Sequence, residues 1–91
     1  MNTYYLVVCP TKERAAMLCR SLVKYLFLED IRCRMIDNGK HWIVDVMGHH
    51  TNIRFVSERQ FYEASTGFHG WVVDEREVEE WLDAAEKGEE V

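Results

Sequence analysis

Two adjacent acids, Asp74 and Glu75, close the apolar run of the segment HGWVVDE at residues 69–75. Carboxylates that follow a buried strand can hold magnesium and orient a water for nucleotide hydrolysis. Acids in this place also suit the start of a helix, because the helix dipole favours negative charge there. Glu77 follows Asp74 at capping-box spacing. We therefore expect Asp74 to cap a helix and Glu75 to lie in its first turn.

Histidine and cysteine side chains would allow two other kinds of chemistry. A zinc site needs ligands on one face, but no two histidines have i, i+4 spacing and no C-x-x-C motif occurs. Cys9 and His69 could act as nucleophile and base if the first and last strands end side by side. Cys9 precedes Pro10 in an apolar run, however, which favours a buried, unreactive thiol. We expect no metal, no cofactor and no catalytic residue, and solvated loop histidines at His41, His49, His50 and His69.

Hydrophobic periodicity predicts the elements that would position these side chains. The run YYLVVCP, residues 4–10, is typical of a short strand buried on both faces. Thr11 is the expected N-cap of a helix over residues 12–28. The apolar residues of this helix fall on one face and should pack on the sheet: Ala15, Leu18, Cys19, Leu22, Val23 and Leu26.

The middle of the chain alternates between apolar and polar residues in RCRMIDNGKHWIVDVMG, residues 32–48. Asn38 and Gly39 can supply the positive backbone angles of a two-residue type I′ turn, so this segment predicts a β-hairpin. Methionine fills irregular gaps in cores. The expected core fillers, beside the tryptophans, are Met17, Met35 and Met47.

The remaining elements are expected as a strand at 52–56, a helix at 58–65, a strand at 70–73 and a helix at 75–87 ended by Gly88. Ser57 and Gln60 have the reciprocal spacing of a capping box, which predicts the start of the first of these helices. The last helix should bury the stripe formed by Val78, Trp81, Leu82 and Ala85.

These elements predict an α/β protein with a small mixed sheet of about five strands and three helices, in the order β-α-β-β-β-α-β-α. Strands that alternate with helices imply parallel neighbours joined by crossovers, and the hairpin adds an antiparallel pair. Ninety-one residues, 47% of them hydrophobic, suffice for one core but not two. We expect a single domain over residues 1–87 and a flexible tail at 88–91.

Charge and cysteine usage limit the class of protein. The net charge of -5 argues against a general affinity for phosphate backbones, which depends on clustered Lys and Arg. Three cysteines at wide spacing indicate reduced thiols and a cytoplasmic setting. The first ten residues carry no basic leader, and no apolar run approaches about 18 residues, so we expect neither a signal peptide nor a membrane span.

A resemblance to P-loop ATPases rests on two segments. LVVCPTKERAAMLCRSLVKYL, residues 6–26, resembles the strand-Pro-Thr-helix segment that follows the phosphate loop in ATPases of the helicase and phage terminase type. IRFVSERQFYEASTGFHGWVVDE, residues 53–75, is similar to the stretch of terminase large subunits that ends in an apolar strand and Asp-Glu. The resemblance implies a P-loop-like sheet with Asp74 and Glu75 at the family's metal-holding positions. The chain lacks G-x-x-x-x-G-K followed by Ser or Thr, so we expect no hydrolase.

The first function that fits is a small cytoplasmic interaction protein, encoded by a phage or mobile element, that binds another protein as inhibitor or accessory without catalysis. Aromatic side chains dominate the energetics of interfaces. The candidate anchors are Trp42, Phe61, Tyr62 and Phe68. A homodimer through such a patch, or through an unpaired edge of the sheet, is a further expectation.

The alternative function is a nucleic-acid-associated module that uses the basic face of the hairpin at residues 32–47. Arg32 and Arg34 share a face by strand alternation, so a basic strip on one face of the sheet is expected. The candidate contacts with nucleic acid are Arg32, Arg34, Lys40, Arg54 and Arg59.

Overall fold

The computed structural model describes residues 2–39 and 41–86, which form a mixed five-stranded sheet with three helices. The predicted α/β class and order of elements are confirmed. The elements are β1 (Thr3–Cys9), α1 (Lys12–Leu28), β2 (Cys33–Asp37), β3 (Trp42–Val46), β4 (Thr51–Ser57), α2 (Glu58–Ser65), β5 (Trp71–Asp74) and α3 (Glu75–Glu86). Lys40, the helix end predicted at Gly88 and the predicted tail at 88–91 lie outside the described residues. No helix in the described part of the chain has the length and apolar character needed to cross a membrane.

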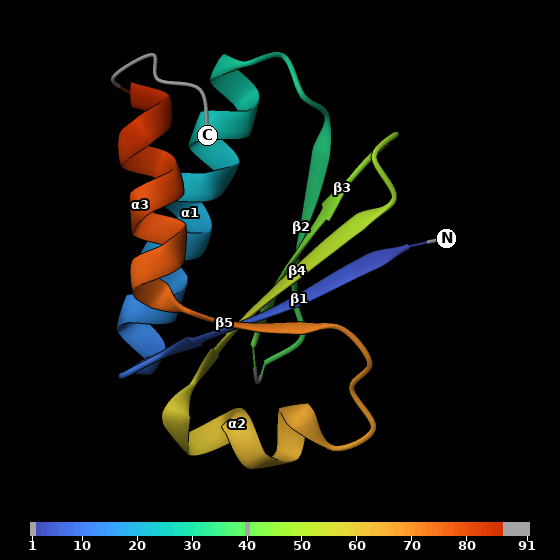
Figure 1. Cartoon of the computed structure of the whole chain (residues 1–91), viewed down its shortest axis with the longest axis vertical. Helices are drawn as coiled ribbons and strands as arrows, with labels where there is room; N and C mark the ends of the chain where they lie inside the picture. Colours follow the sequence, from blue (N-terminus) through green and yellow to red (C-terminus); the bar gives the residue numbers. More distant parts are fainter. Residues whose placement is uncertain (1, 40, 87–91) are drawn as a thin grey trace.

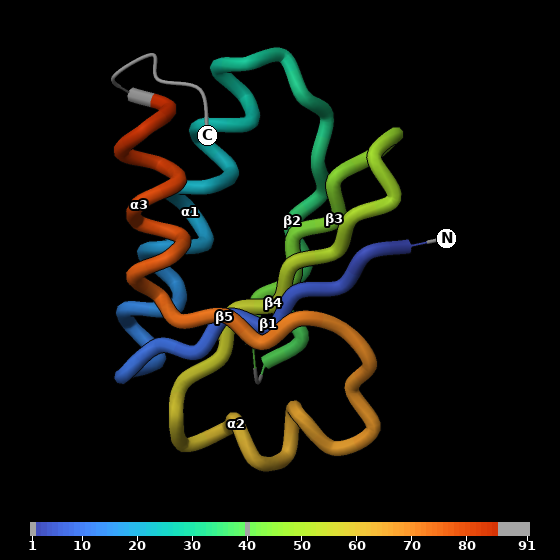
Figure 2. Tube along the Cα trace, in the orientation of Figure 1, coloured from blue at the N-terminus to red at the C-terminus, as the bar shows by residue number. Residues whose placement is uncertain are grey.

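The sheet has the strand order β2-β3-β4-β1-β5, so the first strand of the chain lies inside it. β1 runs parallel to β4 and β5, while β3 runs antiparallel to β2 and β4. α1 and α3 lie side by side on one face, and α2 covers part of the other (Figure 1). The chain trace shows that the crossovers containing α1 and α2 leave the sheet toward opposite faces (Figure 2). The two connections diverge between β1 and β4. In open α/β sheets such a divergence leaves a crevice at the carboxyl ends of the strands.

The core lies between the sheet and the pair of helices α1 and α3. Alternate strand residues point toward these helices, and Val7, Val44 and Phe55 among them are fully buried. The predicted stripe of α1 is confirmed, since five of its six residues are buried and Val23 is half-buried. Truncating Phe55 to alanine should cost about 3 to 5 kcal/mol, because the space it fills is enclosed.

Local signals explain where α1 begins and ends. The hydroxyl of Thr11 accepts a hydrogen bond from the Arg14 N–H at 3.1 Å, which confirms the predicted N-cap. At the other end, Asp30 has φ +58, a left-handed conformation usually taken by glycine. The Ile31 N–H donates to the Leu26 carbonyl at 2.9 Å in a Schellman arrangement. This hydrogen bond ends α1 without a glycine and directs the backbone of Ile31 back toward the helix.

The predicted hairpin is present as β2 and β3, but the prediction of a two-residue type I′ turn is wrong. Asp37 pairs with Trp42, and the Asn38 N–H donates to the His41 carbonyl at 3.3 Å, so the turn is not centred on Asn38 and Gly39. The Asp37 carboxylate accepts from the Gly39 N–H at 2.8 Å, and the Asn38 side-chain oxygen accepts from the His41 N–H at 2.9 Å. Gly39 has φ +85, whereas Asn38 has no positive φ. Hydrogen bonds from the Asp37 and Asn38 side chains stabilise this displaced turn.

Candidate functional site

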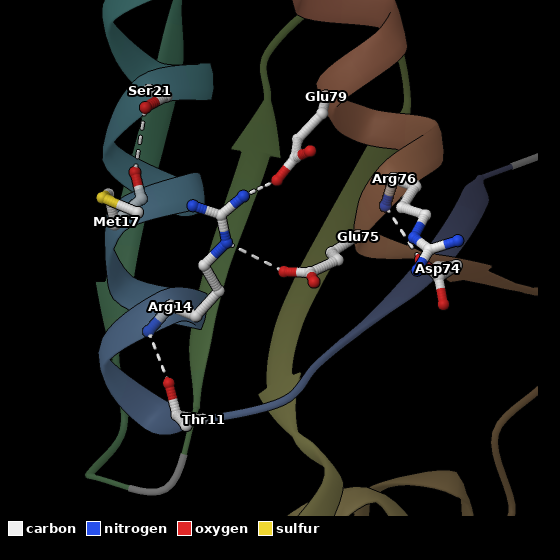
Figure 3. Close-up of polar contacts among 8 residues, drawn as sticks. All are labelled: Thr11, Arg14, Met17, Ser21, Asp74, Glu75, Arg76 and Glu79. Carbon is white, nitrogen blue, oxygen red and sulfur yellow. Dashed lines mark hydrogen bonds and ion pairs between the residues drawn. The ribbon is translucent and has the colours of Figure 1, made fainter.

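The two acids at the end of β5 make structural contacts. The Asp74 carboxylate accepts from the Arg76 N–H at 2.9 Å, which confirms its prediction as the cap of α3 (Figure 3). Glu75 accepts from the Arg14 Nε at 2.9 Å, and the same guanidinium forms an ion pair with Glu79 (Figure 3). Arg14 therefore ties the first turn of α1 to the first two turns of α3.

Cys9 is fully buried and reduced, as predicted. Burial, with the nearby Glu75 carboxylate next in effect, raises the pKa of its thiol to about 12, so the reactive thiolate is disfavoured at neutral pH. His69 precedes β5, at the opposite end of the sheet from the carboxyl end of β1. The pairing of Cys9 with His69 as nucleophile and base is therefore excluded. Within residues 2–39 and 41–86, no three His, Cys, Asp or Glu side chains could together hold a metal ion.

The four aromatic candidates for protein binding do not form one surface. Trp42 lies on the α1 face, half-buried against the core, with the Lys12 ammonium 5.9 Å from its ring centre. Phe61 is half-buried, while Tyr62 beside it in α2 is 85% exposed. Phe68 packs over Gly70, where an added Cβ would lie 2.9 Å from its ring and 2.3 Å from the Tyr4 carbonyl oxygen. Tyr62 is thus the one fully exposed member of the four.

The basic candidates are also spread out. Arg34 and Arg54 share the face of the sheet that carries α2, but Arg34 lies 3.6 Å from the Asp45 carboxylate, an ion pair that offsets its charge. Arg54 is half-buried, and its Nε has no hydrogen-bond partner among the described residues. Arg32 lies before β2, and Arg59 lies in the first turn of α2. The predicted strip is reduced to Arg34 and Arg54 on that sheet face.

An exposed apolar surface lies instead beside the edge strand β2, and we call it the β2-edge surface. It surrounds a depression of about 590 Å³. Its apolar residues are Val23, Phe27, Ile31, Cys33 and Met47, with Asp30 and Arg32 at the same depression. Phe27 is 78% exposed and Met47 is 52% exposed, which is unusual for large apolar side chains that lie together.

This surface was missed because two sequence patterns were assigned to the core. Met17, Met35 and Met47 are exposed, so their prediction as core fillers is wrong. Phe27 and Leu28 extend the apolar run at the end of α1 beyond the stripe that faces the sheet. Since a single helix face cannot bury three successive residues, the run LFL at residues 26–28 was the available signal.

A second cavity, of about 430 Å³, lies at the carboxyl ends of β1 and β4, and we call it the β1–β4 cavity. Cys9 and Ser57 are paired at the ends of these strands, so α1 and α2 begin at the same level on either side (Figure 1). The cavity is lined by Pro10, Thr11, Lys12, Glu13, Gly39, Ser57, Arg59 and Gln60.

Ser57 in this cavity departs from the sequence prediction. It holds the N-cap position of α2, but its side chain makes no capping hydrogen bond, so the predicted capping box with Gln60 is wrong. The residue is only 8% exposed. Its hydroxyl therefore lines the cavity without a hydrogen-bond partner among the described residues, at a place where two helices begin.

The chain was compared with family models, curated proteins and solved structures. No family model, curated protein or solved structure matches the chain.

Proposed function

We propose that the chain is a small cytoplasmic protein-binding module that acts without catalysis, and that the β2-edge surface is its contact surface. The observation that carries the proposal is the group of exposed apolar side chains at the 590 Å³ depression, with Phe27 78% exposed. Exposed apolar patches on small proteins commonly mark interaction sites, because burying them is favourable.

The partner we propose is an extended segment of another protein. β2 is an edge strand, so the backbone N–H and C=O groups on its outer side face no neighbouring strand. An added strand would pair with these groups, and one of its apolar side chains would enter the depression between Phe27 and Met47. Asp30 and Arg32 at the same depression supply charges of both signs that can fix the direction of the segment.

The test uses a photo-crosslinking amino acid at position 27 in cells that express the protein, with position 62 as the control. Tyr62 is 85% exposed but lies in α2, which packs on the other face of the sheet. A partner that crosslinks at position 27 and not at 62 is then purified and measured by calorimetry. Phe27→Lys should weaken its binding at least tenfold, because a central apolar anchor is lost.

Tyr62→Lys is the matched variant and should bind within about twofold of the wild type, since exposed residues outside an interface contribute little. Equal affinity for Phe27→Lys and wild type would contradict the proposal. A second copy of the chain is the other outcome to distinguish. Sedimentation at several concentrations would then show a dimer that Phe27→Lys dissociates.

We also propose an origin for the fold that agrees with the resemblance to helicase and terminase cores. The chain would descend from a P-loop-like sheet and be encoded by a phage or mobile element. It is supported by the motifs themselves, with β1 followed by Pro10 and Thr11, and β5 ending at Asp74 and followed by Glu75. These two strands are parallel neighbours in the sheet.

Nucleic-acid binding is the second candidate, and one observation favours it. Arg54 has a half-buried guanidinium whose Nε is unpaired among the described residues, and Arg34 lies on the same face. Such groups could contact phosphates. A mobility-shift assay over a salt series separates this function from protein binding, since phosphate contacts lose affinity steeply as salt rises. A salt-sensitive complex weakened by Arg54→Gln would favour this second candidate.

A further inference from the structure

We propose that the β1–β4 cavity binds the phosphate group of a phosphate monoester. This site is separate from the β2-edge surface. Its residues come from two short segments, 10–13 and 57–60, and from the hairpin tip, and the strand order brings them together.

The unpaired hydroxyl of Ser57 points to a ligand. The residue is 8% exposed and lines the cavity, and its hydroxyl has no hydrogen-bond partner among the described residues. Because this hydroxyl is open to the cavity, its proton is available to a bound group. A phosphate oxygen in the cavity would accept the hydrogen bond that the hydroxyl can donate.

Two helices begin at this cavity and both favour an anion there. The first N–H groups of a helix have no partner within it, and the helix dipole places partial positive charge at the same end. In α1 the Thr11 hydroxyl accepts a hydrogen bond from the Arg14 N–H. The N–H groups of Lys12 and Glu13 remain available to a ligand. In α2 no side chain caps the first turn. Such helix starts are established binding sites for phosphate groups.

The charged side chains favour a doubly charged anion over a singly charged one. Among the described residues, Lys12 and Arg59 line the cavity, and Glu13 is the one acid that does so. Two cations and two helix starts outweigh one exposed carboxylate, because each helix start adds about half a positive charge. A phosphate monoester carries close to two negative charges near neutral pH and presents three oxygens, enough to meet donors from both helices.

The size of the cavity indicates a monoester rather than inorganic phosphate alone. Its volume of about 430 Å³ leaves room beside the phosphate for the group to which it is esterified. Two sources share this chemistry: a free small-molecule monoester and a phosphorylated serine of a bound protein. The test therefore uses both.

The experiment is a titration of the full chain followed by ¹H–¹⁵N NMR, with ionic strength held constant by sodium chloride. The probes are inorganic phosphate, glycerol 3-phosphate and a short peptide containing phosphoserine. We expect saturable shifts centred on the amides of Lys12, Glu13, Arg59 and Gln60. Tighter binding of glycerol 3-phosphate identifies a small-molecule site, and tighter binding of the peptide identifies a phosphoprotein site. No saturable binding of any probe overturns the proposal.

Matched variants separate this site from general charge attraction. Ser57→Ala and Arg59→Gln should each weaken binding of the best probe by about tenfold, since each removes a hydrogen bond to a charged ligand. Arg20→Gln removes an exposed cation of α1 outside the cavity and should change the affinity less than twofold. Lys12→Gln gives the same test from α1 if either variant fails to fold. Equal loss in Arg20→Gln and Arg59→Gln would overturn the proposal.

Discussion

Asp74 and Ser57 occupy the same place in two neighbouring units of the fold, each as the last residue of a parallel strand and the residue before a helix. Asp74 bonds the first turn of α3, whose first glutamate is held by Arg14. Ser57 bonds nothing in the first turn of α2 and faces a cavity. Similar capping patterns in the sequence thus produce one helix start that is closed by the protein and one that is open to a ligand.

Arg14→Ala gives the largest expected effect at the closed helix start. The change removes the partner of both Glu75 and Glu79 and should lower the free energy of unfolding by about 1 to 2 kcal/mol, a modest value because these groups are partly exposed. Urea denaturation measures it. Arg20→Ala, at an exposed site on the same helix, is the control and should change stability by less than about 0.5 kcal/mol.

Asp74→Ala should lower the free energy of unfolding by about 0.5 to 2 kcal/mol, because the bond to the Arg76 N–H is lost. Asp74→Asn should retain most of the stability, since asparagine caps helices nearly as well. Thermal and urea unfolding of both variants measure the difference. Equal destabilisation by Ala and Asn would show that the charge of Asp74, and not its capping bond, matters.

Cys9 sits at the carboxyl end of β1 beside the closed helix start, and its pKa predicts a pH effect. The unfolded chain loses the thiol proton near the ordinary pKa of 9.0, whereas the folded chain keeps it up to about 12. The free energy of unfolding should therefore fall as pH rises above 9, by about 1.4 kcal/mol at pH 10. Cys9→Ala should lack this part of the decline. Urea curves at pH 8 and pH 10 that change in parallel for both proteins would refute it.

Ser57→Ala gives the smallest expected effect and tests the open side of the comparison. Because the hydroxyl makes no capping bond, its removal should change the free energy of unfolding by less than about 0.5 kcal/mol without ligand. The same urea assay measures it beside Asp74→Ala. A loss as large as that of Asp74→Ala would mean that Ser57 caps α2 in solution, and the two helix starts would then be alike.

Local signals in the sequence were sufficient for most of the fold. Thr11, the apolar spacing of α1 and the run before Asp74 predicted elements whose bounds differ little from those observed. The turn at Asn38 and Gly39 was predicted wrongly because the Asp37 and Asn38 side chains, not the dipeptide alone, determine the loop.

The candidate sites could not be predicted in the same way. Both depend on the strand order, which local patterns do not determine. The capping-box pattern at Ser57 and Gln60 has the same letters whether or not the hydrogen bonds form. Phe27 and Met47 line the same depression because α1 ends near the edge strand. The end of α1 is set by Asp30, in a conformation that glycine usually takes.

The interior position of β1 has a consequence for the order in which the protein assembles. The hairpin of β2 and β3 can pair as soon as its residues are made, but the neighbours of β1 are β4 and β5, which are synthesised later. Until then both edges of β1 are open, and α1 alone can shelter its apolar side chains. Pairing between segments that are distant in the sequence is slow, and the intermediates before it expose apolar surface and aggregate readily. β1 therefore gains its second neighbour only after β5 has been made, so we expect the pairing of β1 with β5 to be a late step of folding.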